Sequence, residues 1–173
     1  MTTLTAATNA DLPAIAALVN SAYRGESSRQ GWTTEADYIE GQRTDAGTLA
    51  RDLAADPEAR LLMLHEAGEL LGSVWLEPAG EGAWYLGMLT VRPDLQAGGV
   101  GRRLLSAAED WVRQAGGRRV RMTVISIRDT LIAWYQRRGY LLTGERRPFP
   151  YGIEDLGRPL RPDLEFVVME KAL

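Results

Sequence analysis

The 173-residue chain has no cysteine and only one histidine, His65. Without cysteine there is no disulfide framework, no thiol nucleophile and no thiolate metal ligand, and one histidine cannot build a histidine metal cluster. No apolar run approaches the roughly 20 residues that span a bilayer, and the first residues carry no basic-then-apolar leader. These absences predict a soluble cytoplasmic protein with no metal site and no membrane partner.

Positive charge is also scarcer than negative charge, with 20 lysines and arginines against 23 acidic residues and a formal net charge of −3. This balance argues against a nucleic-acid partner held by bulk positive charge. Hydrophobic residues make up 45% of the chain and charged residues 25%, which is ordinary for a globular protein. The length predicts one domain covering residues 1–173, with a core of its own.

Hydrophobic periodicity and turn signals predict a mixed α/β chain. The predicted helices are one that begins at residues 9–11 and runs to 22, then 33–39, 46–54, 99–114, and one from 129 to a stop at Gly139. The predicted strands are 2–7, 61–66, 70–76, 83–91, 120–125, 140–144 and 164–169, with a proline- and glycine-rich loop at 148–162. We expect antiparallel pairing in the first part and βα crossovers later.

The most informative segment is the glycine-rich turn between the predicted strand 83–91 and the predicted helix 99–114. It reads Gln96-x-x-Gly99-x-Gly101 and follows Arg92-Pro93. A glycine-rich turn at a helix start leaves backbone N–H groups unpaired at the positive end of the helix dipole, which favours a phosphate or pyrophosphate ligand. The alternative is a helix-entry turn without a ligand, for which three glycines are entropically costly.

Two common phosphate loops do not fit this turn. A P-loop requires Lys-Ser/Thr after its last glycine, and Gly101 is followed by Arg102-Arg103. A dinucleotide fingerprint requires a third glycine, where this chain has Leu104. The pattern instead resembles the acyl-CoA pyrophosphate loop of the GNAT superfamily of acyl-CoA-dependent N-acyltransferases.

A second segment, residues 128–140, resembles the GNAT pattern Asn-x-x-Ala-x-x-Leu/Phe-Tyr-x-x-x-Gly-Phe/Tyr that closes the cofactor site. Tyr135 and the turn at Gly139 match it, whereas Arg128 stands in place of the asparagine and Leu131 in place of the alanine. The resemblance extends over essentially the whole chain. It implies an α/β (mixed α+β) GNAT fold, in which a mostly antiparallel central sheet, flanked by helices, splays apart between the strands that end near residues 91 and 125.

The resemblance also implies that the cofactor is acetyl-CoA. The backbone of residues 89–91 would bind the pantetheine arm and the acetyl carbonyl, and the N–H groups of residues 96–102 would surround the pyrophosphate. Arg128 is expected to supply a different contact from the usual asparagine, to a phosphate for example, or none. The predicted cofactor-binding residues are Leu89, Thr90, Val91, Gln96, Ala97, Gly98, Gly99, Val100, Gly101, Arg102, Arg128 and Tyr135.

The implied reaction is direct attack of a primary amine of a small molecule on the thioester in a ternary complex, which needs no covalent enzyme intermediate. Tyr135 is the candidate general acid for the departing thiolate, and the alternative is a core tyrosine. Glu26 and Glu35 lead as candidate general bases, because the segment between the first two helices lines the acceptor pocket in this fold. The other candidates are Glu40, Glu77 and His65.

The same segment carries the candidate acceptor-binding residues. Tyr23 and Trp32 offer apolar walls, and Arg24 and Arg29 can pair with a carboxylate or phosphate. An acceptor with both an amine and an anionic group would fit, and the alternative is a polar surface loop. A protein acceptor, an acyl-CoA-binding module without transfer activity, and a homodimer that uses residues 148–151 all stay open.

Overall fold

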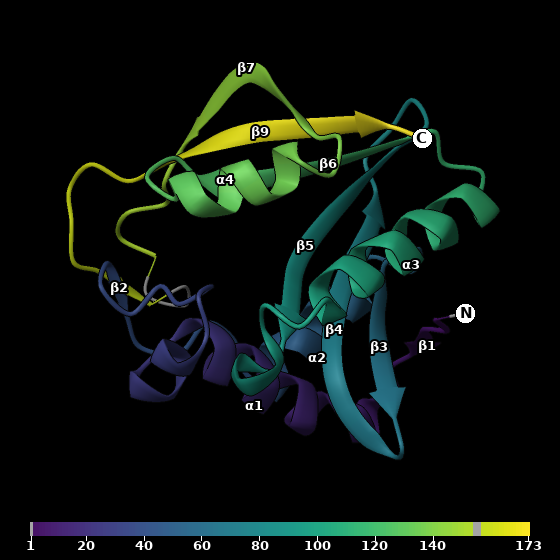
Figure 1. Cartoon of the computed structure of the whole chain (residues 1–173), viewed down its shortest axis with the longest axis horizontal. Helices are drawn as coiled ribbons and strands as arrows, with labels where there is room; N and C mark the ends of the chain where they lie inside the picture. The colour runs from purple at the N-terminus through teal and green to yellow at the C-terminus, as the bar shows by residue number, and fades with distance from the viewer. Residues whose placement is uncertain (1, 154–156) are drawn as a thin grey trace.

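The computed structural model describes residues 2–153 and 157–173. Seven strands form one sheet in the order β1-β3-β4-β5-β6-β9-β7, in which only the β5–β6 pair is parallel (Figure 1). Their bounds are β1 (Thr5–Ala6), β3 (Arg60–Glu66), β4 (Glu69–Pro78), β5 (Ala83–Val91), β6 (Arg119–Ile125), β7 (Leu141–Pro148) and β9 (Glu165–Ala172). A separate antiparallel pair consists of β2 (Ile39–Glu40) and β8 (Arg158–Pro159).

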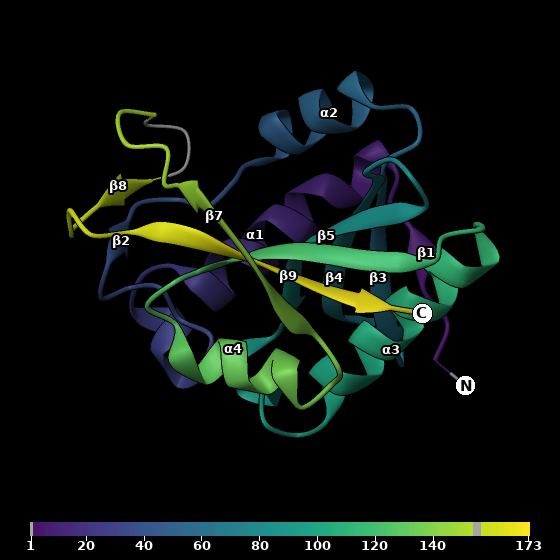
Figure 2. The ribbon, with the colours of Figure 1, turned by 90° about the horizontal axis from the view of Figure 1, so that it is seen from above.

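Helices cover both faces of the large sheet (Figure 2). One face carries α1 (Leu12–Tyr23) and α2 (Ala46–Ala55), and the other carries α3 (Val100–Gln114) and α4 (Asp129–Gln136). The short 3-10 helices are η1 (Asn9–Asp11), η2 (Glu26–Gln30) and η3 (Pro93–Leu95). Within residues 2–153 and 157–173, none of the helices combines the length and the apolar character needed to cross a bilayer.

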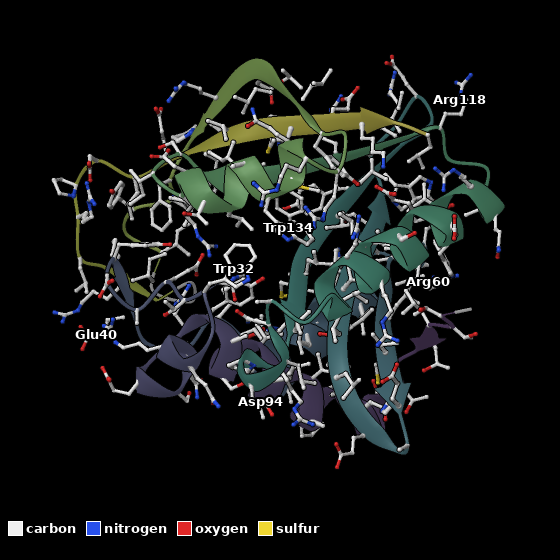
Figure 3. The ribbon with its side chains drawn as sticks, viewed as in Figure 1. Trp32, Glu40, Arg60, Asp94, Arg118 and Trp134 are labelled. Carbon is white, nitrogen blue, oxygen red and sulfur yellow. The ribbon has the colours of Figure 1, made fainter. Side chains whose placement is uncertain are left out.

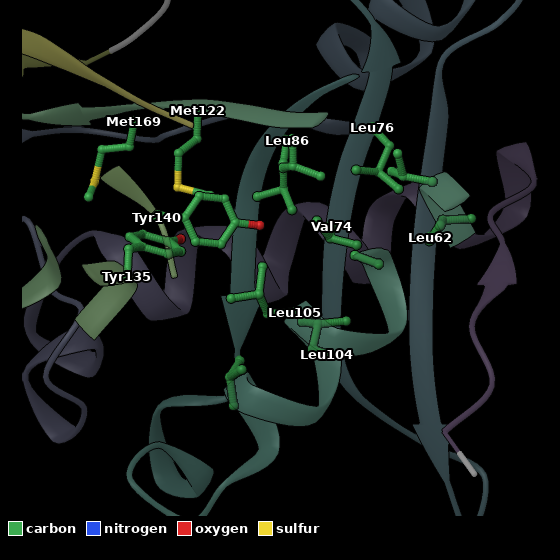
Figure 4. Close-up of a cluster of buried hydrophobic side chains, with 14 of the residues drawn as sticks. Leu62, Val74, Leu76, Leu86, Leu104, Leu105, Met122, Tyr135, Tyr140 and Met169 are labelled. Carbon is green, nitrogen blue, oxygen red and sulfur yellow. The ribbon is translucent and has the colours of Figure 1, made fainter. Parts of the chain in front are cut away.

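The core is divided between the two faces of the sheet. Leu61 and Met63 of β3 pack with α1 and α2, whereas Leu62 and Leu64 pack in the cluster that contains α3 and α4. Because successive side chains of a strand point to opposite faces, a strand covered on both sides is apolar throughout. The cluster that contains Leu62 and Leu64 also includes Tyr135 and Leu104, and it fills the space between the sheet and the helices α3 and α4 (Figure 4).

The sheet opens between β5 and β6. The two strands pair only where residues 83–85 lie beside residues 119–121, after which β6 continues along β9. The β4–β5 register shifts by one residue between the pairs Ser73–Thr90 and Trp75–Gly87, so β5 contains a β-bulge. Met88 in this bulge has a φ of +47°. The predicted GNAT-type fold, with its splayed and mostly antiparallel sheet, is confirmed.

The predicted helix over 33–39 is wrong. Residues 35–39 make a single turn, with Ile39 N–H bonded to the Glu35 carbonyl at 2.9 Å, and the chain then enters β2. Buried Ile39 pairs with Pro159 of β8, so long-range contacts outweigh the local helix signal. The last part of the chain also differs from the prediction, because β7 continues to residue 148 and β8 interrupts the predicted loop, of which residues 154–156 lie outside the described residues.

Candidate active site

Two cavities lie where β5 separates from β6. The first, called here the loop cavity, has a volume of about 260 Å³ and is lined by Trp32, Gln96, Gly99, Gly101, Arg102, Trp134 and Arg138, among others. The second, called the strand cavity, has a volume of about 170 Å³ and is lined by Arg24, Glu35, Arg43, Tyr85, Thr123 and Arg128, among others. Both cavities share the side chains of Tyr23, Leu89, Leu131 and Tyr135, so they meet there.

The glycine-rich turn presents unpaired N–H groups to the loop cavity. The first helical hydrogen bond of α3 runs from Arg103 N to Gly99 O at 3.1 Å. The N–H groups of Val100, Gly101 and Arg102 therefore have no backbone acceptor in the described part of the chain. Gly99 has a φ of +87°, and a Cβ built there would meet no atom within 4 Å. This geometry is suited to an anionic ligand at the start of the helix.

The Gln96 side chain ties the turn to the segment after η2. Its amide oxygen accepts from Trp32 N at 2.8 Å and Thr33 N at 3.1 Å. Its amide nitrogen donates to Thr33 Oγ1 at 2.8 Å and Val91 O at 3.1 Å. The Gln96 side chain therefore holds the wall of the loop cavity, and its backbone N–H is also engaged, because it donates to Pro93 O at 3.5 Å.

Trp32, Trp134 and Arg138 also line the loop cavity, and Figure 3 labels the two tryptophans. The ring centroids of Trp32 and Trp134 are 6.1 Å apart, and the Arg138 guanidinium lies 3.9 Å from the Trp134 ring centroid. Burial lowers the pKa of Arg138, and the neighbouring positive charge of Arg102 lowers it further. Two guanidinium groups lining one cavity favour a ligand that brings negative charge.

Most of the predicted cofactor-binding residues lie at the loop cavity. Thr90, Gly98 and Val100 do not contribute to its lining. Arg128 lies elsewhere: it lines the strand cavity, where its guanidinium donates to Thr33 O at 2.6 Å. The geometry therefore moves Arg128 from the expected cofactor set to the opposite cavity. The predicted residues that line the loop cavity are Leu89, Val91, Gln96, Ala97, Gly99, Gly101, Arg102 and Tyr135.

Tyr135 stands on the wall that the two cavities share. Its ring makes edge contacts with Trp134 and Tyr140, with centroids 5.1 and 5.7 Å away (Figure 4). No hydrogen bond joins its hydroxyl to another residue that the structure describes. Burial raises the pKa of Tyr135, the nearby Tyr23 raises it further, and Arg128 acts in the opposite direction. The hydroxyl is thus a protonated donor facing the cavities.

Backbone groups of β5 also face the opening. The Tyr23 hydroxyl donates a short hydrogen bond to the Leu89 carbonyl, and burial raises the pKa of this tyrosine. Arg92 N–H donates to Leu71 O at 2.9 Å, on the β4 side. Because successive N–H groups of a strand alternate in direction, the Val91 N–H points away from β4 and toward the opening. This donor is placed to polarise a carbonyl oxygen.

Glu35 lies between two arginines in the strand cavity. Arg24 Nε is 3.3 Å from one carboxylate oxygen and Arg128 Nη1 is 3.4 Å from the other. The side chains of Arg24, Arg128 and Glu35 are 6, 8 and 10% exposed. Both oxygens are therefore engaged in buried ion pairs, so the predicted role of Glu35 as a general base has no free oxygen to support it.

The remaining candidates are placed away from the two cavities. Glu26 is 89% exposed on η2 and forms an ion pair with Arg29, which also pairs with Asp37 on the surface. Neither residue lines the loop cavity or the strand cavity, so the geometry adds no support to their predicted roles. The alternatives also lie elsewhere: exposed Glu40 pairs with Arg158, and His65 and Glu77 lie on β3 and β4.

Sequence reasoning missed three features of the site. Arg138 lies in the second motif, and its spacing of three residues from Tyr135 could have drawn attention to it. A glycine inside a strand often marks a bulge, so Gly87 was an unused signal for the bulge in β5. Arg43 carried no signal, because it follows Gln42 in an ordinary polar stretch and reaches the strand cavity only through the fold.

Comparison with known proteins places this geometry in context. A family profile described as the Acetyltransferase (GNAT) family matches residues 15–140. The IAA acetyltransferase of Azospirillum brasilense is 31% identical over 131 residues, which cover 75% of this chain and 74% of that protein. The ribosomal-protein-S18-alanine N-acetyltransferase from Escherichia coli has a TM-score of 0.70 at 19% identity, covering 99% of this chain and 94% of the other. A GNAT family acetyltransferase from Elizabethkingia anophelis with acetyl-CoA bound has a TM-score of 0.58 at 15% identity, covering 72% and 82%.

The splayed sheet and the glycine-rich helix start define the class as a GNAT-type acyltransferase fold. The chain belongs to the GNAT acetyltransferase family, as the two sequence motifs predict. This family uses acetyl-CoA. The loop cavity fits that cofactor, since it offers unpaired N–H groups, two guanidinium groups, and glycines at Gly99 and Gly101 where side chains would occupy the space.

Substituting alanine for Gly101 should weaken acetyl-CoA binding without weakening the fold. A Cβ there would lie 3.5 Å from Trp134 and 3.7 Å from Val91, which are ordinary contacts, so the protein tolerates the methyl group. The methyl group projects into the cavity wall, and we expect the Kd of acetyl-CoA to rise about tenfold or more while Tm does not fall.

The matched control is Gly47→Ala, because Gly47 is likewise the second residue of its helix but lines neither the loop cavity nor the strand cavity. Calorimetric titration of both variants with acetyl-CoA measures the difference. Equal Kd values for Gly101→Ala and the unmodified protein would contradict a phosphate at this turn.

Proposed function

We propose that this protein, acting as one domain over residues 1–173, transfers an acetyl group from acetyl-CoA to the primary amine of a small molecule. The observation that carries the proposal is the meeting of the loop cavity and the strand cavity at four shared side chains. A donor in the first cavity and an acceptor in the second can react directly, because they approach from opposite sides of the opening. The absence of cysteine is consistent with direct transfer.

The loop cavity holds the donor. Bound acetyl-CoA supplies an activated thioester. The N–H groups of Gly101 and Arg102 bind its pyrophosphate, and the guanidinium groups of Arg102 and Arg138 add positive charge. The Val91 N–H, directed to the opening of the sheet, donates to the acetyl carbonyl oxygen and stabilises the negative charge that develops there.

Tyr135 supplies the proton for the departing sulfur, and the proton that the attacking nitrogen releases as the amide forms restores the tyrosine. Its hydroxyl faces both cavities and keeps its proton at neutral pH, because burial raises its pKa. Among the described residues, Glu35 is the only carboxylate that lines the strand cavity, and its oxygens are bound to Arg24 and Arg128. The acceptor amine therefore loses its proton to solvent before the transfer.

A two-step experiment tests the proposal. Calorimetric titration with acetyl-CoA is followed by a thiol-release assay with a panel of small primary amines. We expect saturable binding and thiol release that requires an amine. Release only with peptide N-termini would indicate a protein acceptor, and binding without release on either panel would indicate a non-catalytic acyl-CoA binder. Failure to bind acetyl-CoA would contradict the role given to the loop cavity.

A further inference from the structure

The strand cavity holds more positive than negative charge. Three guanidinium groups line it, from Arg24, Arg43 and Arg128, and among the described residues only Glu35 contributes a carboxylate. Arg24 and Arg128 are buried, so their charges must be compensated within the protein, whereas half-buried Arg43 can pair with a ligand. One carboxylate cannot neutralise three guanidinium groups, so we compared the partners of the three arginines.

Arg24 and Arg128 are fully engaged. Besides their shared pairing with Glu35, Arg24 Nη1 donates to Gly41 O at 3.1 Å, and Arg128 Nη2 donates to Thr33 O at 2.6 Å. These bonds hold both guanidinium groups against the cavity wall. Burial lowers the pKa of Arg24, and Glu35 opposes that effect. One carboxylate is thus shared between two buried cations.

Arg43 is the uncompensated arginine of the cavity. Within residues 2–153 and 157–173, no carboxylate forms an ion pair with its guanidinium and no side-chain hydrogen bond holds it. Its backbone is nevertheless fixed, because Asn20 Oδ1 accepts from Arg43 N at 2.7 Å and Asn20 Nδ2 donates to Thr44 O at 2.9 Å. A fixed backbone places this cation at the cavity, where the neighbouring positive charge of Arg43 also acts on Arg24.

We infer that the acceptor amine also carries an oxyanion, a carboxylate or a phosphonate, and that Arg43 binds this group in the strand cavity. The inference rests on the proposed function, and it names the substrate class. An oxyanion beside Arg43 would compensate the unpaired charge and form a charge-assisted hydrogen bond. The cavity of about 170 Å³ is smaller than the usual 300–1,000 Å³ of drug-sized ligand sites, so the acceptor is compact.

Matched acceptors test this specificity. Short amino carboxylates are compared with their carboxamides and with aminoalkyl phosphonates of equal chain length, and kcat/KM is measured by thiol release above the amine pKa values. We expect the oxyanion-bearing amines to exceed the carboxamides by about tenfold or more, the usual effect of a hydrogen bond to a charged group. The comparison of carboxylate with phosphonate identifies which oxyanion the cavity prefers.

The variant Arg43→Gln should remove this preference. We expect kcat/KM for the amino carboxylate or phosphonate to fall about tenfold or more, while kcat/KM for the carboxamide and the Kd of acetyl-CoA change less than about twofold. Arg51→Gln is the control, because Arg51 is exposed on α2 and, among the described residues, its side chain bonds only to Thr48. Equal losses on charged and uncharged acceptors, or an unmodified protein that uses carboxamides equally well, would overturn the inference.

Binding separates this inference from the proposed function. If no amine is acetylated, the transfer proposal fails, and calorimetric titration of the CoA-loaded protein with the same amino carboxylates and phosphonates still tests the oxyanion site. Binding that is lost in Arg43→Gln and kept in Arg51→Gln would support the site without catalysis. Absence of binding by every member of both series would overturn it.

Discussion

Replacing Tyr135 by phenylalanine should lower kcat about tenfold or more and leave the fold intact. Loss of a positioned general acid slows a reaction by about 10²- to 10⁴-fold when proton transfer limits the rate. The ring of the new residue keeps its contacts with Trp134 and Tyr140, and the hydroxyl makes no hydrogen bond to another described residue. Steady-state thiol release gives kcat, and thermal unfolding gives the stability.

Tyr140→Phe is the matched control for this variant. Tyr140 is also a buried tyrosine, but its hydroxyl donates to Glu109 Oε2 at 2.8 Å and lies in neither the loop cavity nor the strand cavity. Removing that hydroxyl should cost about 1.5–3 kcal/mol of unfolding free energy, the usual range for a hydrogen bond to a charged group, with kcat unchanged. An unchanged kcat in Tyr135→Phe would remove Tyr135 from the mechanism, whatever its stability.

The pH dependence of the unmodified protein provides a second check on Tyr135. A pKa raised above its ordinary value of 10.0 keeps the hydroxyl protonated throughout the neutral and mildly alkaline range. With solvent as the proton acceptor, kcat/KM for the amine should rise with pH until the amine pKa is passed, with no decline below pH 10 from loss of the tyrosine proton. A bell-shaped profile with a maximum near pH 8 would contradict this assignment.

Replacing Glu35 by glutamine should lower the unfolding free energy by about 3–5 kcal/mol, the usual result of leaving buried charges without their partner. Arg24 and Arg128 both lose their compensating charge, and both are more than nine-tenths buried. The neutral amide keeps the shape of the side chain, so the loss reports charge and not volume. Chemical denaturation measures it directly.

Glu26→Gln provides the control for a surface carboxylate. Glu26 is 89% exposed, so its ion pair with Arg29 should contribute less than about 0.5 kcal/mol. Combining Glu35→Gln with Arg128→Gln should recover part of the loss, because one uncompensated cation is removed with the anion. A stable Glu35→Gln protein that has lost activity would instead restore Glu35 as a candidate base.

Most secondary structure could be predicted because its causes are local. The continuous apolar runs of β3 and β4 and the apolar face of α3 follow from the residue pattern within each segment. The helix prediction for residues 33–39 was wrong because distant partners hold these residues: Glu35 pairs with Arg128, and Ile39 pairs with Pro159. Helix propensity reflects only neighbouring residues, whereas these contacts join residues more than 90 positions apart in the sequence.

In the candidate site, too, features with local causes could be predicted and features that depend on distant residues could not. The glycine-rich turn could be predicted from the sequence, because glycine has no Cβ atom and adopts the required backbone conformation. Arg128 shows the limit, since the motif places it at the cofactor position and the fold turns its guanidinium to Glu35 and Thr33. A side chain as long as arginine can reach either cavity, so its backbone position does not decide its partner.

The sequence by itself determined the GNAT family, the mixed α/β fold and the glycine-rich turn at the start of α3, because each depends on residue types at fixed local spacing. Only the tertiary structure decided the charge of the strand cavity. That charge depends on which carboxylates reach Arg24, Arg43 and Arg128. Among the described residues Glu35 alone does so, pairing with Arg24 and Arg128, and it is separated from Arg128 by 93 positions. Electrostatic compensation depends on the distance between charges in space and on their burial, and the sequence alone specifies neither.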